Sequence, residues 1–197
     1  MKKKIKITFN APVILGFALV SLAALVVDFL TGGASNRLLF MTYRAPLWNP
    51  LTYLRLFTHV LGHSGWSHYI GNMAYFLLLG PMLEEKYGSK RILGVMAVTA
   101  VITGLVNTLF FPNVALCGAS GIVFAFILLT SFTSFREGEL PLTVILVAVI
   151  YIGQQVYEGI FVSDNVSNLS HILGGVVGAV LGYRLNKKSG RHGLSTR

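Results

Sequence analysis

Charge is what this sequence has least of. Charged side chains make up 12% of the 197 residues, about half of the roughly 25% that is usual in a soluble domain. A single cysteine, Cys117, excludes a disulfide-stabilised scaffold, and a hydrophobic content of 54% excludes a disordered chain. The composition therefore excludes a water-soluble globule as well, and it favours a protein that is surrounded by lipid.

Acidic residues are especially scarce, with 7 Asp and Glu against 16 Lys and Arg and a formal net charge of +9. A nucleic-acid-binding protein would gather such charge in a stripe or a patch on its surface. Here the basic residues fall between long apolar runs, which is the pattern of a multispanning membrane protein. We therefore expect no nucleic-acid partner, and we expect a lipid bilayer around the chain.

Six stretches approach the length of about 20 apolar residues that a helix needs to cross a bilayer. They cover approximately residues 11–30, 68–83, 92–111, 114–132, 140–157 and 169–185. This pattern predicts an all-α membrane protein with six spans in one domain over residues 11–185. Basic segments flank that domain at residues 1–10 and 186–197.

The basic residues also predict how the spans are oriented. Only Arg37, Arg44 and Arg55 fall on the side opposite the termini. Because basic segments tend to stay in the cytoplasm, both termini are predicted there, in a plasma membrane of the bacterial inner-membrane type. The basic start also fits a secretory signal peptide, but residues 11–30 exceed the roughly 7 to 15 residues of a signal core, which favours an uncleaved span.

The segment between the first two spans, residues 31–67, is too apolar for a solvated loop. Trp48 and Tyr53 suit the headgroup level of a bilayer, while Pro46 and Pro50 prevent one long helix. We expect this first loop to associate with the outer leaflet of the membrane.

Four polar residues that are rare in lipid-crossing helices fall at one depth near the outer face. His68 opens the second span with Asn72 one turn later, Ser120 opens the fourth span, and His171 opens the sixth. Polar groups inside spans are expensive, so a functional role is the default hypothesis for them.

His171 shares one face of its predicted helix with Gly174 and Gly178. Small residues at this spacing let a second helix approach closely, and the span that begins at Ser120 offers Gly121 as a matching small residue. If these two faces meet, the hydroxyl of Ser120 and the imidazole of His171 come within reach of each other.

A hydroxyl beside an imidazole is the minimum for nucleophilic catalysis, because serine is inert until a base removes its proton. In this sequence His171 would be the base for Ser120. The ring N–H of His68, the amide of Asn72 and the backbone N–H of Ser120 are the types of donor that stabilise an oxyanion.

Several motifs, taken in order along the chain, resemble those of the rhomboid intramembrane serine proteases. They are Leu54-Arg55-Leu56-Phe57-Thr58-His59, the series His59, His63, His68 and Asn72, the turn Glu84-Glu85-Lys86-Tyr87-Gly88-Ser89, the stretch Gly118-Ala119-Ser120-Gly121, and His171-Ile172-Leu173-Gly174 followed by Gly178. The resemblance runs from about Arg55 to Gly182, and it implies the six-helix bundle of that family.

The resemblance also implies roles for individual residues. Ser120 becomes the nucleophile and His171 the general base of a Ser-His dyad, with an oxyanion hole around His68, Asn72 and Gly118. The implied reaction is hydrolysis of a peptide bond in or next to the transmembrane segment of single-span or multi-span membrane-protein substrates. It takes place near the outer face and needs no cofactor. We expect the active unit to be a monomer, and the sequence leaves the oligomeric state open.

Other residues receive supporting roles. Phe124 stands where some family members stack a tyrosine on the catalytic imidazole, so the ring is kept and the hydroxyl is lost. Arg55, His59 and His63 are expected to brace the first loop. The spacing of His59 and His63 also fits zinc ligands, but no Cys or carboxylate at ligand spacing completes a tetrahedral site, so we expect no metal.

The sequence leaves alternatives open. An acid on the outer side, Asp28, Glu158 or Asp164, would turn the dyad into a triad. A catalytically inactive rhomboid-like protein would bind and guide membrane proteins, and a small transporter would use the polar residues as a path. We prefer the protease because Ser120 and His171 are both present and because the polar residues cluster at one depth instead of crossing the bilayer.

Overall fold

A computed structural model describes residues 8–111, 113–133, 139, 141–161 and 168–193 of the chain. Its elements are α1 (Pro12–Leu30), the π-helical turn η1 (Asn36–Phe40), α2 (Pro50–Thr58), the 3-10 turn η2 (His59–Leu61), α3 (Trp66–Tyr87), α4 (Ser89–Phe110), α5 (Ser120–Ser131), α6 (Leu142–Phe161) and α7 (Asn168–Gly193). The described residues form no β-strand, and the predicted all-α architecture is confirmed.

Each of the six predicted stretches overlaps one of the long helices α1 and α3 to α7. Among the described helices, α1 and α4 are long and apolar enough to cross a membrane by length and composition alone. Several boundaries differ from the sequence-based expectation. The helix α3 extends from Trp66 to Tyr87, α4 begins at Ser89, α6 ends at Phe161, and α7 continues to Gly193.

The fourth stretch needs a larger correction, because residues 114–119 are not helical as expected. Leu116 instead forms an isolated antiparallel bridge with Thr42, in which each backbone N–H donates to the carbonyl of the other residue at 2.8 to 2.9 Å. Gly118 then turns the chain with a φ of +123°, and α5 begins two residues later at Ser120. The hydropathy of this segment matches a span, whereas its backbone hydrogen bonds are made with the first loop.

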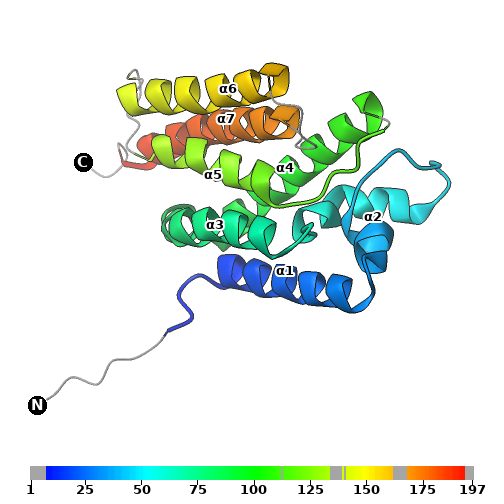
Figure 1. The fold of residues 1–197 in the computed structure, drawn as a ribbon. Coiled ribbons are helices and arrows are strands. Elements are labelled where there is room, and N and C mark those ends of the chain that lie inside the picture. The colour runs from blue at the N-terminus through cyan, green and yellow to red at the C-terminus, as the bar shows by residue number, and fades with distance from the viewer. Residues whose placement is uncertain (1–7, 112, 134–138, 140, 162–167, 194–197) are drawn as a thin grey trace, which may run out of the picture.

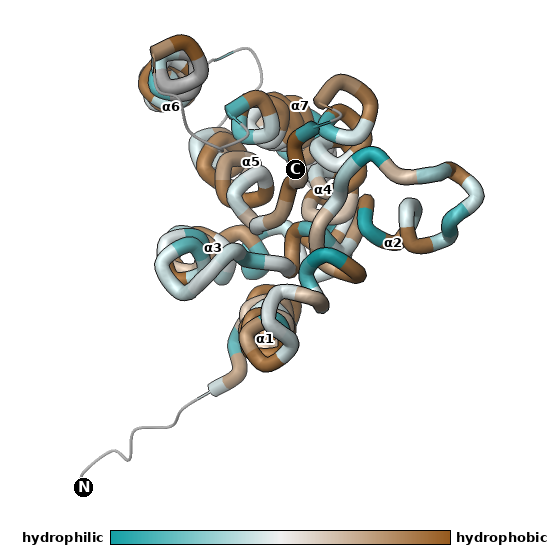
Figure 2. The backbone as a smooth tube through the Cα atoms, turned by 45° about the vertical axis from the view of Figure 1, so that its right-hand side comes forward, coloured by the Kyte–Doolittle hydropathy of each residue, from teal (hydrophilic) through white to brown (hydrophobic). Residues whose placement is uncertain are grey.

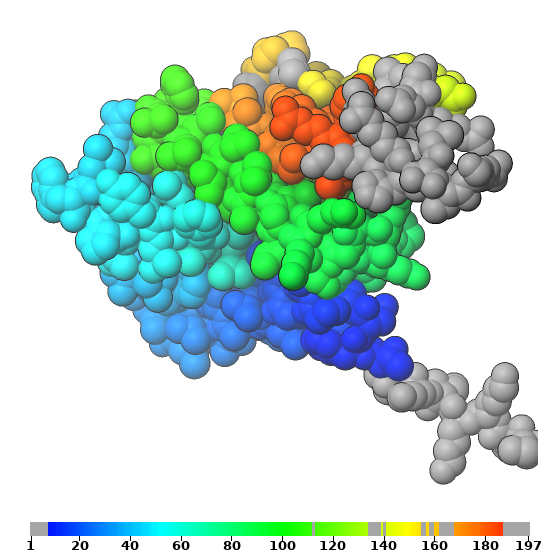
Figure 3. Space-filling model, turned by 180° about the vertical axis from the view of Figure 1, so that it is seen from behind, coloured from blue at the N-terminus to red at the C-terminus, as the bar shows by residue number. Residues whose placement is uncertain are grey.

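The helices are arranged as a row with one helix behind it. In Figure 1 α1, α3, α5, α7 and α6 follow one another across the molecule, and neighbours in this order pack together. Seen from behind in Figure 3, the green segment that includes α4 lies between α1 and α7. The first residues of α3, α5 and α7 all lie at the same end of the bundle (Figure 1). The polar residues near these three helix starts are therefore brought together.

The tightest seam in the bundle joins α5 to α7. A Cβ placed on Gly174 would lie 2.0 Å from the carbonyl oxygen of Gly121, and one placed on Gly178 would lie 2.1 Å from the carbonyl oxygen of Ala125. Separations this short leave room only for hydrogen, so glycine at both positions of α7 is what lets the two backbones touch. The structure thus places the small faces of the two helices against each other.

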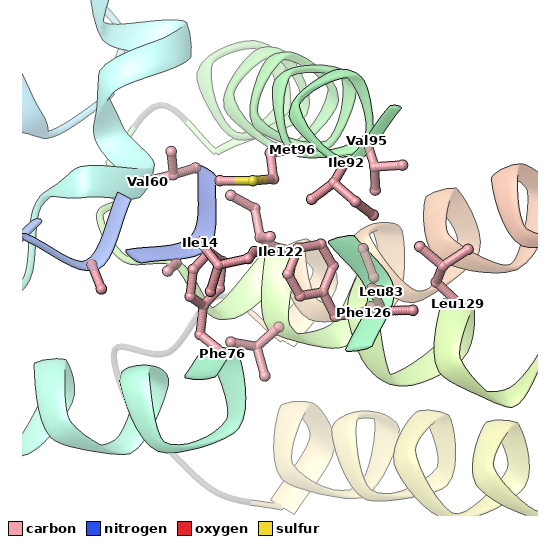
Figure 4. Packing of buried hydrophobic residues seen from close by; sticks show 14 of the residues in the cluster. Ile14, Val60, Phe76, Leu83, Ile92, Val95, Met96, Ile122, Phe126 and Leu129 are labelled. Atoms are coloured by element: carbon pink, nitrogen blue, oxygen red, sulfur yellow. The ribbon is translucent and has the colours of Figure 1, made fainter. Parts of the chain in front are cut away.

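The apolar core fills the space between α1, α3, α4 and α5. Phe76 and Phe126 stack with ring centroids 5.3 Å apart, and both side chains are fully buried together with that of Ile14 (Figure 4). Large apolar side chains also cover the outside of the bundle. Phe29 is 77% exposed, and Figure 2 shows apolar residues along α1 and α6, the helices at opposite edges of the row. Such an exterior is unfavourable in water and suits a lipid environment.

Candidate active site

A cavity of about 660 Å³ lies at the end of the bundle where α3, α5 and α7 begin. Side chains from the first loop, from α3, from the segment before α5 and from the first turns of α5 and α7 line it: Met41, Ser64, Ser67, His68, Gly71, Asn72, Ala115, Leu116, Cys117, Ser120 and His171. The cavity thus brings together His68, Asn72, Ser120 and His171, the four residues that the sequence placed at one depth.

Ser120 is the first residue of α5. The first hydrogen bond of this helix is donated by the N–H of Val123 to the carbonyl of Ala119, at 3.0 Å. Backbone N–H groups before that point have no acceptor within the helix, and they carry the positive end of the helix dipole. The hydroxyl of Ser120 therefore lies at a helix end that favours negative charge.

His171 lies in the first turn of α7, and its ring is held flat against that of Phe124 in α5. The two ring centroids are 4.6 Å apart and the planes are within 8° of parallel. Tyr151 of α6 in turn contacts Phe124 edge-on, with ring centroids 5.4 Å apart. The stack on Phe124 therefore holds the imidazole in one plane, and α6 contacts the ring on which it stacks.

His68 and Asn72 face the cavity from the start of α3. The amide nitrogen of Asn72 donates to the carbonyl of His68 at 3.1 Å, one helical turn earlier. The Nδ1 atom of His68 lies 3.1 Å from the hydroxyl of Ser64 and 3.4 Å from the backbone nitrogen of the same residue. Both side chains are therefore held by short-range contacts within the turn that leads into α3.

Gly118 lies directly against the imidazole of His68. A Cβ at this position would be 2.7 Å from both Nε2 and Cε1 of His68, and the φ of +123° is one that other residues rarely adopt. The backbone N–H of Gly118 already donates to the carbonyl of His59 at 2.9 Å. What Gly118 offers the cavity is thus space beside His68, whereas its own N–H is engaged elsewhere.

Arg55 lies in the interior of the first loop and is only 3% exposed. Its guanidinium lies 4.4 Å above the ring of Tyr43, donates to the hydroxyl of that tyrosine, and bonds the carbonyl of Leu51 at 3.0 Å. A buried charge needs such partners, and in satisfying them Arg55 holds two separate stretches of the loop together.

His59 and His63 are also buried in the first loop. Their Nδ1 atoms lie 3.1 Å and 3.2 Å from the carbonyls of Arg55 and Leu61, so each ring bonds its own segment of chain. Burial lowers the pKa of both histidines from 6.5 to about 4, because the charged form loses its hydration. Both rings are therefore neutral at physiological pH.

Among the acids considered as a third catalytic residue, the structure describes the side chain of Asp28, which does not line the cavity. The carboxylate of Asp28 accepts from the backbone and the amide of Asn36, each at 2.8 Å, and from the hydroxyl of Ser35. The side chain of Glu158 and the whole of Asp164 lie outside the described residues.

Two features of the site lie outside the sequence-based predictions. The bridge between Thr42 and Leu116 joins the first loop to the segment before Ser120, and nothing local predicts this pairing. The hydroxyl of Thr103 in α4 lies 3.4 Å from Nε2 of His59. Thr99, Thr103 and Asn107 recur every fourth residue on one buried face of α4, and this polar periodicity is the signal that points inward.

Comparison with known families now adds to this geometry. A family model for the rhomboid domain matches residues 50–188, which include every helix from α2 to most of α7. This chain belongs to the rhomboid family. As a rhomboid it is an integral membrane protein, in keeping with its apolar exterior.

Curated rhomboids from animals and bacteria are similar to the chain. Rhomboid-related protein 2 of the mouse is 32% identical over 157 residues, which cover 68% of this chain and 51% of that protein. Rhomboid protease GlpG of Haemophilus influenzae is 27% identical over 68% of this chain and 72% of its own length. GlpG of Yersinia pestis is 23% identical over 91% of this chain and 65% of its own length. The chain thus spans about half the length of its mouse relative.

Proposed function

We propose that this rhomboid is an intramembrane serine endopeptidase that hydrolyses a peptide bond in or next to the transmembrane segment of membrane-protein substrates. The observation that carries the proposal is one cavity lined by Ser120, His171, His68 and Asn72. The stacking of Phe124 on His171 supports it, because a general base must be held in a defined plane. The bacterial relatives that are named rhomboid protease support it independently.

The chemistry follows from the residues at the cavity. The hydroxyl oxygen of Ser120 attacks the scissile carbonyl carbon while His171 takes its proton. The tetrahedral intermediate collapses, the C–N bond breaks, and His171 returns the proton to the leaving amine. A water molecule then attacks the acyl-enzyme, His171 again acts as base, and the carboxylic product and free Ser120 are restored.

Negative charge develops on the carbonyl oxygen in the intermediate. The backbone N–H of Ser120, the amide of Asn72 and the ring N–H of His68 are the donors proposed for it, and Gly118 leaves the space beside them. Loss of one such donor in a preorganised site reduces the rate by about a hundredfold to a thousandfold.

A dyad, with no third acid, is the form of the site that we propose. Phe124 holds the ring of His171 by stacking, which is the orienting role that an acid plays in a triad. The carboxylate of Asp28 is already bonded to Asn36 and Ser35, on the side of the first loop.

The substrate and the setting follow from membrane chemistry. A transmembrane helix satisfies its own backbone hydrogen bonds, so the scissile carbonyl has to be freed by local unwinding before Ser120 attacks. Single-span and multi-span proteins with weak helix formers near the cut are the proposed substrates. The proposed orientation has both termini in the cytoplasm and the cavity near the outer face of a plasma membrane, because the basic residues lie mostly on the terminal side.

The test is cleavage of a model transmembrane substrate by the purified full chain in liposomes. Ser120→Ala and His171→Ala are each expected to reduce cleavage by about a thousandfold or more. Ser131→Ala is the matched control, because that serine ends the same helix, bonds the carbonyl of Ile127 at 3.1 Å and lies far from the cavity. No cleavage by a folded wild type across several substrates would overturn the proposal in favour of an inactive rhomboid-like binding protein.

A further inference from the structure

One residue of the first loop makes two contacts with the imidazole of His68. Ser64 precedes α3 and lies four residues before His68. Its hydroxyl oxygen is 3.1 Å from Nδ1 of His68, and its backbone N–H donates to the same atom at 3.4 Å. No role has been given to this serine by the sequence motifs.

The backbone contact determines where the proton of His68 lies. A backbone N–H is only ever a donor, so the Nδ1 atom that it faces has to be an acceptor. A neutral imidazole with an acceptor at Nδ1 carries its proton on Nε2. The hydroxyl of Ser64 then also donates to Nδ1, because two donors facing each other would repel.

The proton on Nε2 is on the edge of the ring that faces the segment before Ser120. The position of a Cβ on Gly118 would be 2.7 Å from Nε2, so this edge lies against the chain two residues before the serine. The two tautomers of His68 would have opposite effects on an oxyanion near this edge of the ring. Nε2–H donates to an oxyanion, whereas an unprotonated Nε2 presents a lone pair that repels it.

We propose that Ser64 is a positioning residue, which keeps His68 in the Nε2–H tautomer and so available as a donor to the oxyanion. The inference rests on the proposed protease activity. His63 restrains the same ring from another direction, edge-on with centroids 5.1 Å apart. The contact with His63 limits the tilt of the ring, the backbone N–H of Ser64 selects the tautomer, and the hydroxyl of Ser64 strengthens that selection as a second donor to Nδ1.

Ser67 provides a matched comparison. It is also a serine, it also lines the cavity, and it is adjacent to His68 in sequence. Among the described contacts, the hydrogen bonds to Nδ1 of His68 come from Ser64. Removal of the Ser67 hydroxyl therefore changes the same cavity without touching the tautomer.

The experiment combines imidazole ¹⁵N NMR with kinetics on the purified full chain. The chain has 5 histidines, and the signals of His68 are assigned by their loss in His68→Gln. Wild type is expected to show His68 protonated at Nε2. Ser64→Ala should move the ¹⁵N shifts toward a mixture of tautomers and lower kcat about tenfold, the factor for one ordinary hydrogen bond, with little change in KM. The effect is partial because the backbone N–H of residue 64 remains.

Two further variants make the result specific. Ser64→Thr keeps a hydroxyl and should restore both the Nε2–H signal and most of kcat. Ser67→Ala should leave the His68 signals as in wild type. If Ser64→Ala simply unfolded the protein, the signals of all five histidines would change together, and Ser64→Thr would not restore them.

Two results would overturn the role of Ser64 while leaving the proposed protease intact. One is a Ser64→Ala protein with His68 signals and kcat equal to wild type. The other is a changed tautomer with unchanged kcat. A folded wild type that cleaves no substrate would instead overturn the protease and this inference together.

Discussion

The two ends of the bundle both place polar groups inside an apolar protein, but they use them differently. At one end, Glu84 near the end of α3 is only 5% exposed. Its carboxylate accepts from the backbone N–H groups of Val13 and Ile14, each at 3.1 Å, and from the hydroxyl of Ser89 at 2.6 Å. These bonds cap the start of α1 and connect it to the beginning of α4.

At the other end, His68, Asn72, Ser120 and His171 line a cavity of about 660 Å³. The difference separates the polar groups that hold the fold from those that we propose for chemistry. A buried polar group whose bonds are completed within the protein stabilises the native state, because breaking them leaves unsatisfied groups. A polar group that lines a cavity is accessible to a substrate.

The largest effect on stability is expected at the seam between α5 and α7. Gly174→Ala would place a Cβ 2.0 Å from the carbonyl oxygen of Gly121, so α5 and α7 have to separate. We expect a loss of stability of about 3 kcal/mol or more, at the upper end of overpacking, with loss of cleavage. Thermal denaturation in detergent measures it.

The control is Gly175→Ala on the same helix. Its Cβ would lie 3.6 Å from the side chain of Leu128, which is ordinary contact distance. This variant should denature close to the wild-type temperature. Equal effects of the two substitutions would contradict the close contact at Gly174.

Gly118→Ala should distinguish the two ends of the bundle, because it alters the cavity and leaves the bonds of Glu84 intact. The added Cβ would lie 2.7 Å from the ring of His68, at a φ that alanine disfavours. Displacing this ring should lower kcat about a hundredfold, as expected for loss of one oxyanion donor.

Kinetics of the folded variant in liposomes measure that loss. Gly94→Ala in α4, where a Cβ meets nothing within 4 Å, is its control. Gly118→Ala with full kcat would show that His68 tolerates displacement, and the comparison of the two ends would fail.

Glu84→Gln should have the opposite pattern, with stability reduced and chemistry retained. One acceptor of the α1 cap becomes an amide that donates, so Val13 or Ile14 loses its partner. The expected loss is about 1–3 kcal/mol of unfolding free energy, with kcat per folded molecule unchanged. Glu85→Gln, at an exposed neighbour, is the control for charge. A fall in kcat without a fall in stability would contradict the assignment.

The last effect develops gradually with pH. His59 and His63 have a pKa of about 4 in the folded protein against 6.5 for an ordinary histidine. Between these values the unfolded state binds more protons, so stability is complete above pH 6.5 and decreases as the pH falls toward 4. Denaturation midpoints across this range measure it, and a variant with Gln at both positions should show a flatter profile. A wild type equally stable at both ends of the range would contradict the burial of these rings.

Much of the fold was predictable because its signals are local. Long apolar runs predict helices that cross a membrane wherever they occur, and each of the six runs is helical over most of its length. The error at residues 114–119 has a physical reason. Hydropathy reports burial but not which backbone partner is used, and here the partner is Thr42, more than seventy residues earlier in the chain.

The candidate site, like the fold, was predictable from the sequence only in part. The chemical types of Ser120, His171, His68 and Asn72 are in the sequence, as is the spacing that aligns Gly174 with Gly178. The edge-on contact of His63 with His68 and the engagement of the Gly118 N–H by His59 depend on how the first loop folds back on α3 and α5. No local sequence pattern encodes this folding back of the first loop.

By itself, the sequence determined the helical membrane class, the number of long helices and the residue types available for chemistry, because composition and periodicity act over short distances. Only the tertiary structure decided that α5 and α7 meet backbone to backbone and that Phe124 lies flat on His171. These contacts join segments far apart in the chain and require a fit to within a few tenths of an ångström, which close packing alone provides.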